Sequence, residues 1–286
     1  MSASKTGCGR TRRTLLKLVE SIVLFLSAFV VIYPMAGVLF ASFKTKAEYF
    51  TTSSIALPKS FLYLNNFATV ISEGNLLRAF FNTGLMIVLA CFFSTIICTM
   101  VAYVFSRFQF FGKQWIDRFY TAASFVPSVI VHLIIYRDFA GLGLTNKLIS
   151  IVILYAGVDI ISLYLYRQYF DQISKSLDEA AMLEGCSYAR TYWSILLPVM
   201  KPAITTACIL KTIAIYNDFY TSSLYLNNLK AEPVMSTVLY NFIGVYSAEW
   251  NNIAAGVLLI SLPMFIGFVL MQKFIYKGFS DGAVKG

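Results

Sequence analysis

The sequence predicts an all-α integral membrane protein with six transmembrane helices. Hydrophobic residues make up 58% of the 286-residue chain and charged residues only 13%, about half of the charged share in a soluble domain. The mean hydropathy is +0.70. The apolar residues also gather in runs long enough to cross a hydrocarbon core of about 30 Å as helices. Together these features exclude a soluble domain.

Six apolar runs are the expected spans. The first follows a basic segment, residues 1–14, and it is too long for the apolar core of a signal peptide, so we expect it to be retained. The spans cover about residues 15–43, 79–105, 119–136, 148–169, 203–226 and 253–276. They belong to a membrane domain, residues 15–277, which contains a polar loop at 172–200 and precedes a tail at 278–286. Pro127 and His132 interrupt the third run.

The distribution of basic residues predicts the orientation. With both termini in the cytoplasm, 15 of the 23 Lys and Arg residues lie on the cytoplasmic side and seven lie outside. Basic residues collect on the cytoplasmic side of membrane proteins, so this arrangement is favoured. The same basic loops account for the net charge of +9, and no nucleic-acid partner is expected. The surroundings of the spans are a lipid bilayer.

The polar segment between the fourth and fifth spans has helix signals at both ends. Ser176 and Glu179 have the spacing of a capping box, which predicts the start of a helix. Gly185 is expected to end that helix in the left-handed conformation. Ser187 can cap a second helix, and Pro198 is expected to end it because the residue before a proline avoids the helical region. The segment is therefore predicted to be a helix–turn–helix on the cytoplasmic side.

This segment resembles the EAA signature of ABC importer permeases. The residues at the fixed positions are Glu179, Ala180, Ala181, Gly185, Ile195, Leu197 and Pro198. In that family the segment is a coupling helix that docks into a cleft on the cytoplasmic ATPase. The resemblance therefore implies that these residues receive motion from the ATPase. The alternative is an ordinary amphipathic loop helix, since a serine–glutamate spacing before apolar residues is common.

The tail resembles the ending of the MalG-like half of maltose-transporter permeases. The matching residues at the end of the chain are Gly282, Ala283, Val284, Lys285 and Gly286. In that type the tail enters the interface between the ATPase subunits, whereas a free glycine-rich terminus ordinarily frays. The similarity extends over nearly the whole chain, including Asn65, Asn66 and Phe67 in the outer loop. It implies the type I ABC importer permease fold in a prokaryotic inner or plasma membrane.

Two charges fall inside predicted spans. Asp159 lies near the middle of the fourth span and Lys211 near the middle of the fifth. An unpaired ion at that depth is costly, so we expect the two side chains to pair or to face a wet cavity. A buried packing pair and a place in the translocation pathway are both compatible with the sequence.

Farther along the fifth span, a second polar group resembles the W-N-D-F run of sugar-importing permeases. It consists of Tyr216, Asn217, Asp218 and Phe219, with tyrosine where that family usually has tryptophan. Aromatic faces beside amide and carboxylate groups suit a sugar. Asn217 and Asp218 are expected either to line the path or its gate, or to cap a helix.

The predicted function is a non-catalytic permease subunit of an ATP-driven ABC importer for a carbohydrate such as an oligosaccharide. The chain has no Walker A pattern, so ATP and Mg²⁺ are expected on partner subunits and no cofactor on this chain. The implied partners are a second homologous permease subunit, two ABC ATPase subunits and an extracytoplasmic solute-binding protein.

Other classes of function fit the sequence less well. One alternative is an ABC importer permease for another solute, and a second is a secondary transporter. A secondary transporter would show repeats or a ladder of intramembrane charges. A membrane enzyme would need a nucleophile or a metal site, and the lone histidine, His132, and five cysteines without metal spacing supply neither.

Overall fold

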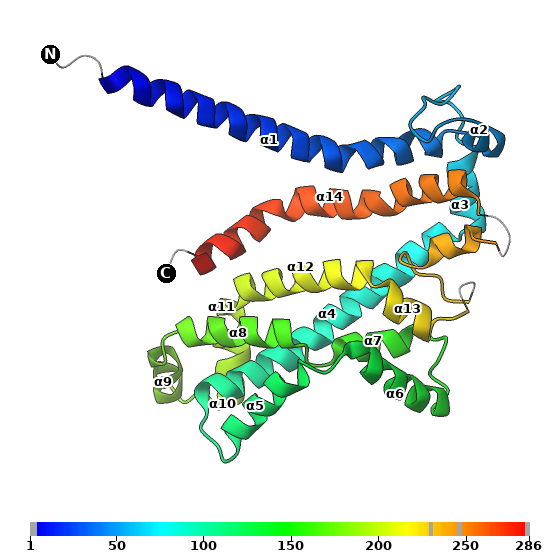
Figure 1. Ribbon diagram of the computed structural model, residues 1–286. Helices are drawn as coiled ribbons and strands as arrows, with labels where there is room; N and C mark the ends of the chain where they lie inside the picture. The colour runs from blue at the N-terminus through cyan, green and yellow to red at the C-terminus, as the bar shows by residue number, and fades with distance from the viewer. Residues whose placement is uncertain (1–4, 229–230, 245–247, 284–286) are drawn as a thin grey trace. The chain divides into compact units, whose positions relative to one another are not determined.

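The structure, a computed structural model, describes residues 5–228, 231–244 and 248–283, with side chains from residue 16 to residue 272 within these ranges. This part of the chain is helical apart from its loops (Figure 1), and the β-type pairing in it is one antiparallel bridge between Ile243 and Ala248. The chain divides into two compact units. The first contains residues 1–72 and 242–261, and the second contains residues 73–241 and 262–286.

Four helical segments are long and apolar enough to cross a membrane. They are Leu16–Ser42, Leu76–Arg107, Leu148–Gln172 and Trp250–Gln272. Two further pairs of helices, each bent sharply at a short break, raise the number to six if each pair counts as one span. The all-α membrane fold expected from composition is therefore confirmed, with four to six candidate spans by length and composition.

The centre of the second unit is α4 (Leu76–Arg107), on which α7 (Leu148–Ala156), α8 (Ile160–Gln172) and α12 (Lys201–Asn217) pack. Small side chains recur on α4 at intervals of four residues, which places them on one face of the helix. These residues, all buried, are Ala90, Ser94, Cys98 and Ala102. Small residues let helix backbones approach closely, which is how helices associate where lipid offers no hydrophobic drive.

Two apolar clusters lie along this packing. One joins the C-terminal half of α4 to α8 and α12, and its largest members are Tyr103, Tyr166, Phe170 and Tyr192. The other joins the N-terminal half of α4 to α7, the end of α12 and α13 (Phe219–Tyr225). Because α4 contributes to both clusters, it connects the two ends of the unit.

The third predicted span, residues 119–136, is not one straight helix. The structure has α5 (Lys113–Ala123) and α6 (Ser128–Gly141), bent by 99° relative to each other. Pro127 stands at the break, directly before α6. Proline has no N–H to donate and disfavours the helical region for the residue before it, which favours a break at this position.

The fourth and fifth predicted spans are also broken. The fourth divides at Gly157–Asp159 into α7 and α8, and the fifth divides at Asp218 into α12 and α13. Each second helix begins at an aspartate whose carboxylate accepts a hydrogen bond from a backbone N–H of its first turn. A helix break inside apolar surroundings is tolerated when side chains satisfy the freed backbone groups.

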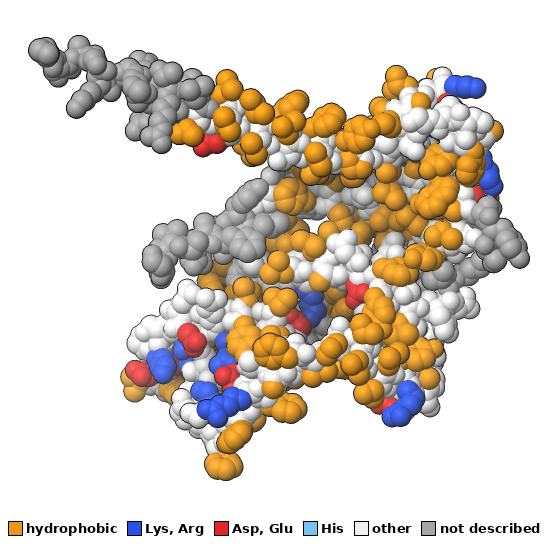
Figure 2. All heavy atoms as spheres, in the orientation of Figure 1, with side chains coloured by type: hydrophobic (Ala, Val, Ile, Leu, Met, Phe, Trp, Pro, Cys, Tyr) orange, Lys and Arg blue, Asp and Glu red, His pale blue; other side chains and the backbone are white. Residues whose placement is uncertain are grey.

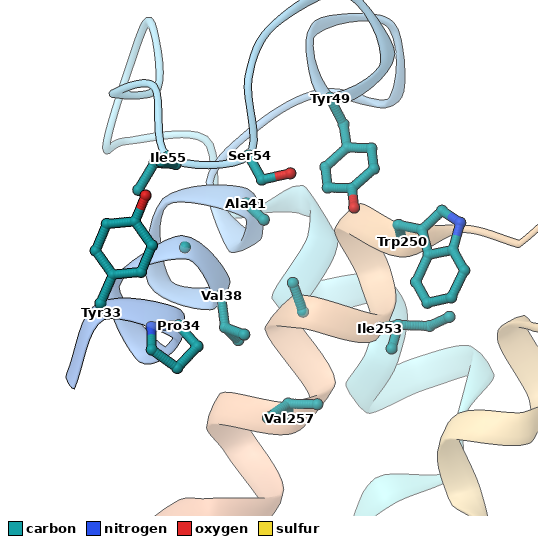
Figure 3. Close-up of a pocket in the computed structure, with 12 residues that line it drawn as sticks. Tyr33, Pro34, Val38, Ala41, Tyr49, Ser54, Ile55, Trp250, Ile253 and Val257 are labelled. Atoms are coloured by element: carbon teal, nitrogen blue, oxygen red, sulfur yellow. The ribbon is translucent and has the colours of Figure 1, made fainter. Parts of the chain in front are cut away.

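The first unit contains α1 (Lys5–Ser42), α2 (Lys46–Thr51), most of α3 (Asn65–Glu73) and the start of α14 (Trp250–Ala283). The two short helices α2 and α3 lie between the first and second expected spans. An apolar pocket of about 340 Å³ lies among these elements (Figure 3), bordered by Tyr33, Tyr49 and Trp250. None of the site residues predicted from the sequence lines this pocket.

Asn66 connects these elements of the first unit. Its side-chain amide donates to the carbonyl oxygens of Ser42 and Lys44, at 2.8 Å each, and its Oδ1 accepts from Asn251 at 2.8 Å. Asn66 and Asn251 are both buried. A buried amide is costly unless its hydrogen bonds are made, so the three bonds hold the loop, α3 and α14 in one arrangement.

Replacing Asn66 with alanine tests this connection. The change leaves two buried carbonyl oxygens and the Asn251 amide without their partner, and we expect the free energy of unfolding to fall by about 1–3 kcal/mol. Thermal unfolding of the detergent-solubilised protein measures the effect. Asn65→Ala is the matched control because Asn65 is exposed on the same helix. Equal melting temperatures for the two variants would contradict the assignment.

Candidate functional site

The loop between α8 and α12 begins with α9 (Ser176–Leu183). Gly185 follows with φ of +81°. The Gly185 N–H donates to the Met182 carbonyl and the Cys186 N–H donates to the Ala181 carbonyl, both at 3.0 Å. These two bonds form a Schellman motif, which satisfies carbonyls at the helix end and requires the left-handed residue. The left-handed conformation predicted for Gly185 at the end of this helix is confirmed.

The start of α9 differs from the prediction. Ser176 is already the first helical residue, and its hydroxyl is hydrogen-bonded to that of Ser174 at 2.7 Å instead of capping the helix. The predicted capping box of Ser176 and Glu179 is therefore wrong. The helix N-terminus instead has Asp178 and Glu179 in its first turn, where negative charge interacts favourably with the helix dipole.

The second half of the loop begins as predicted and then continues. The Ser187 hydroxyl accepts from the Arg190 N–H at 3.3 Å and caps α10 (Tyr188–Thr191). Pro198, however, does not end the helix. A wider π-helical turn, η1 (Tyr192–Leu196), leads into α11 (Leu197–Val199), where proline stands in the first turn and needs no N–H partner. The chain bends by 71° only after α11, before α12.

The loop has an exposed face on α9. Glu179, Ala180, Met182 and Leu183 are exposed, and Leu183 has 89% of its surface free. Ala181 is buried, so the two alanines of the signature, Ala180 and Ala181, face different surroundings. Met182 and Leu183 lie beside the exposed Glu179 and Glu184, and an exposed apolar patch with a polar rim is typical of a site that binds another protein.

The opposite face of the loop is packed against the rest of the second unit. Tyr192, Leu196 and Met200 are buried in the apolar cluster that α4 and α8 form. The Tyr192 and Thr99 hydroxyls are hydrogen-bonded at 2.7 Å, which ties η1 to α4. Of the remaining signature positions, Ile195 and Leu197 are partly buried and Pro198 is exposed. The loop is therefore fixed to the helices on one side and open on the other.

Charged side chains gather at the end of the second unit that carries this loop (Figure 2). In the view of Figure 2, red and blue groups lie where Figure 1 places α5, α8 and α9, and apolar side chains cover much of the helices beside them. The charged residues in the sequences of these helices are Lys113, Asp117, Arg118, Arg167, Asp171, Asp178 and Glu179. Such a boundary between charged and apolar surface is expected where a protein leaves the hydrocarbon layer.

Asp159 and Lys211 are paired. The Lys211 Nζ lies 2.7 Å from Asp159 Oδ2 and 2.7 Å from Ser94 Oγ, so α12, α8 and α4 meet at one ammonium group. The Lys211 side chain is only 10% exposed and that of Asp159 is 37% exposed. Asp159 Oδ1 also accepts from the Ser162 N–H at 2.8 Å and caps α8. The pairing predicted from the sequence is confirmed, and Ser94 is a partner that sequence reasoning missed.

Asp218 belongs to a separate group. Its Oδ1 accepts from the Thr221 N–H at 2.9 Å, which caps α13, and its Oδ2 accepts from the Tyr155 hydroxyl at 2.7 Å. Asn217 donates to the Ile213 carbonyl of its own helix, and Tyr216 is buried. The cap that the sequence left as one of two alternatives is thus present in the structure. Tyr155 was missed because a single tyrosine in an apolar run carries no sequence signal.

The remaining predicted features are placed as follows. Gly282 and Ala283 form the last residues of α14, and Val284, Lys285 and Gly286 lie outside the described residues. His132 Nδ1 lies 3.4 Å from the Tyr225 hydroxyl, in the hydrogen-bonded setting expected of a structural histidine. Among the described residues, His, Cys, Asp and Glu side chains form no group that could hold a metal ion.

A double-mutant cycle tests the energetic value of the Lys211–Asp159 pair. Lys211→Met leaves a partly buried carboxylate without its counter-ion and is expected to lower the stability by up to about 3 kcal/mol. Asp159→Asn removes the charge but keeps a good helix cap. The double variant should be more stable than the sum of the two single effects predicts, because it leaves no unpaired ion. Thermal unfolding in detergent measures all three, and strict additivity would show that the pair is not coupled.

Comparison with known proteins identifies the family. Residues 94–281 match the family described as the binding-protein-dependent transport system inner membrane component. The chain is 33% identical over 255 residues, covering 89% of it and 92% of the relative, to the probable starch degradation products transport system permease protein AmyC of Thermoanaerobacterium thermosulfurigenes. It is 27% identical over 265 residues, with 91% and 94% covered, to the trehalose/maltose transport system permease protein MalG of Thermococcus litoralis.

The fold has a counterpart among solved structures. The chain superposes with a TM-score of 0.78 and 21% identity on a chain from the crystal structure of a bacterial ABC transporter involved in the import of the acidic polysaccharide alginate, covering 91% of this chain and 96% of that one. The match supports the type I ABC importer permease fold. Together with the family match, it shows that this chain belongs to the inner-membrane permease components of binding-protein-dependent ABC importers and is a multi-pass membrane subunit.

Proposed function

We propose that this chain forms half of the translocation pathway of an ATP-driven importer for a carbohydrate, in particular an oligosaccharide. The cargo class is supported by the relatives, whose names concern starch degradation products and trehalose or maltose. The coupling role is carried by one observation, the two-faced loop: α9 exposes Met182 and Leu183, while Tyr192 and Leu196 fix the loop to α4 and α8. The chain itself has no catalytic role in this proposal.

The mechanism is alternating access. The exposed face of α9 docks on a cytoplasmic ATPase subunit, and Glu179, Ala180 and Gly185 shape that face. When ATP brings two ATPase subunits together, the loop follows as a rigid body and tilts the helices to which it is packed. ATP has this effect only if its bound state favours one arrangement of the helices, so the two sites are coupled reciprocally.

The partners follow from this arrangement. A second homologous permease subunit completes the pathway, two ABC ATPase subunits bind ATP and Mg²⁺, and a solute-binding protein delivers the cargo from outside. Both termini lie in the cytoplasm of a prokaryotic cell, with the chain in its inner or plasma membrane. The tail, Gly282 to Gly286, enters the ATPase interface, and its resemblance to the MalG-like ending supports a heterodimer of permease subunits.

The polar groups of the helix bundle supply contacts or a gate along the path. Asp159 with Lys211 forms one such group, and Tyr216, Asn217 and Asp218 lie on another part of the bundle. A carboxylate or amide oxygen has more than one acceptor site, so it can accept a hydrogen bond from a sugar hydroxyl while keeping the partners that it already has. The partial exposure of the Asp159 side chain, 37%, supports access to such a partner.

Gly185 provides a direct test of coupling. A β-branched residue is strained at φ of +81°, so Gly185→Val should distort the end of α9 and uncouple ATP hydrolysis from uptake. Asparagine tolerates this conformation, and Gly185→Asn is therefore the matched control that should retain coupling. A Cβ added at Gly185 would meet no neighbouring atom within 4 Å. The two substitutions therefore differ in backbone strain and not in steric contact with other residues. Normal uptake per ATP by the valine variant in reconstituted vesicles would contradict the proposal.

The cargo is identified by purifying the assembled complex with its co-eluting subunits and analysing the bound glycan. Uptake of that glycan into proteoliposomes should require ATP and the binding protein. A bound solute of another class would replace the carbohydrate assignment while leaving the importer assignment intact. Uptake by the isolated chain without an ATPase would support a secondary transporter instead.

A further inference from the structure

Arg107, the last residue of α4, contacts the segment that leads into the coupling loop. Its Nη1 donates to the Phe170 carbonyl at 3.2 Å and its Nη2 donates to the Ile173 carbonyl at 2.9 Å, both at the C-terminal end of α8. Cations are favoured there because the last carbonyls of a helix are unsatisfied and carry partial negative charge. One guanidinium thus binds α4 to the end of α8.

The same guanidinium reaches α9. Arg107 Nε lies 3.1 Å from Asp178 Oδ2, and the two side chains are only 7% and 10% exposed. Neither Asp178 oxygen has a hydrogen-bond partner among the described residues, so the charge of Arg107 is the main compensation for this buried carboxylate. Removing one member of such a pair leaves an uncompensated buried ion, which makes the contact costly to break.

The first turn of α9 is held to the cluster of α4 and α8 by one apolar side chain, Leu177, and by this ion pair. Only Ile173, Ser174 and Lys175 separate α8 from α9, and Glu179, Ala180 and Met182 on α9 are exposed. A short link of this kind is where a helix pivots when it is pushed. Arg107 spans the link, holding its two ends to α4.

We propose that Arg107 is a positioning residue that makes the coupling helix α9 and the end of α4 move as one body. This inference rests on the proposed coupling function and adds a second route for it. Motion of α9 passes to α12 along the chain through η1 and α11, and to α4 through the Arg107–Asp178 ion pair. Because α4 contributes to both apolar clusters, the second route reaches the far end of the unit.

The test uses the complete transporter in lipid vesicles, with its ATPase subunits and binding protein and with the cysteines of this chain replaced. Spin labels at Gln109 and Glu184, both exposed, report the distance between the end of α4 and α9. A second pair, at Glu184 and the exposed Leu142, reports whether α9 moves relative to the α6 end of the unit. Both distances are measured without nucleotide and with ATP and Mg²⁺.

In the protein with Arg107, the Gln109–Glu184 distance should keep one narrow distribution in both conditions, while the Glu184–Leu142 distance changes. In Arg107→Met the Gln109–Glu184 distribution should broaden or shift when ATP binds. Stimulation of ATP hydrolysis by the binding protein should fall at least about fivefold, the low end of ordinary coupling between sites. Arg107→Lys, which keeps the charge, should recover part of both signals.

Two further variants separate positioning from folding. Asp178→Asn removes the ion pair but keeps the side-chain shape, so it should show the same broadening even if Arg107→Met fails to assemble. Arg167→Met breaks another ion pair of the same unit, with Asp117, which does not involve α9. This control should leave the label distances and the stimulation unchanged.

The results separate the two hypotheses. A Gln109–Glu184 distance that behaves alike in the parent protein, Arg107→Met and Asp178→Asn, while the Glu184–Leu142 distance still responds to ATP, would overturn the role of Arg107 alone. An unresponsive Glu184–Leu142 distance in the parent protein would overturn the coupling function, and with it this inference.

Discussion

The pairing of charges within an apolar helix bundle is the constraint on which the second unit depends. Holding an ion away from water destabilises the folded protein by roughly several kcal/mol unless a counter-ion and hydrogen bonds compensate the charge. Lys211 is compensated by Asp159 and Ser94, which come from two other helices. Asp159 also caps α8. The pairing of this one carboxylate therefore relates the break in the fourth span to the position of α12 beside it.

Close packing turns these local contacts into a connected unit. The small side chains on α4, such as Ala90 and Ala102, let α7, α8 and α12 approach its backbone. Packed interiors have few alternative arrangements, so a displaced element moves its neighbours or changes to a distinct packing. The loop that contains α9 is joined to this packing through Tyr192 and Leu196. A force on the loop is therefore transmitted to helices rather than absorbed by a flexible connection.

Two kinds of feature were predicted correctly from the sequence. One is set by the backbone conformation of a single residue, and the other by the high cost of leaving a charge unpaired inside the membrane. Gly185 is one case and the Lys211–Asp159 pair is another. The errors arose where neighbours competed. The hydroxyl of Ser176 is hydrogen-bonded to that of Ser174 and does not cap α9. Pro198 lies in the first turn of α11, after η1, and does not end the helix. The sequence held no signal for the contact of Arg107 with Asp178, because both residues stand at polar helix ends, where a charged residue is ordinary and does not call for a counter-ion.

The exposed face of α9 keeps apolar side chains in contact with its surroundings at a cost. Leu183 leaves 89% of its surface free and Met182 beside it is also exposed, although burying such side chains is worth about 1.5–3 kcal/mol each. The same helix exposes the charged side chain of Glu179, so a charged residue is compatible with this surface. Its other face is already packed and cannot be changed without disturbing the cluster of α4 and α8. The free apolar face is thus the part of the loop that can vary without disturbing the packing of the second unit.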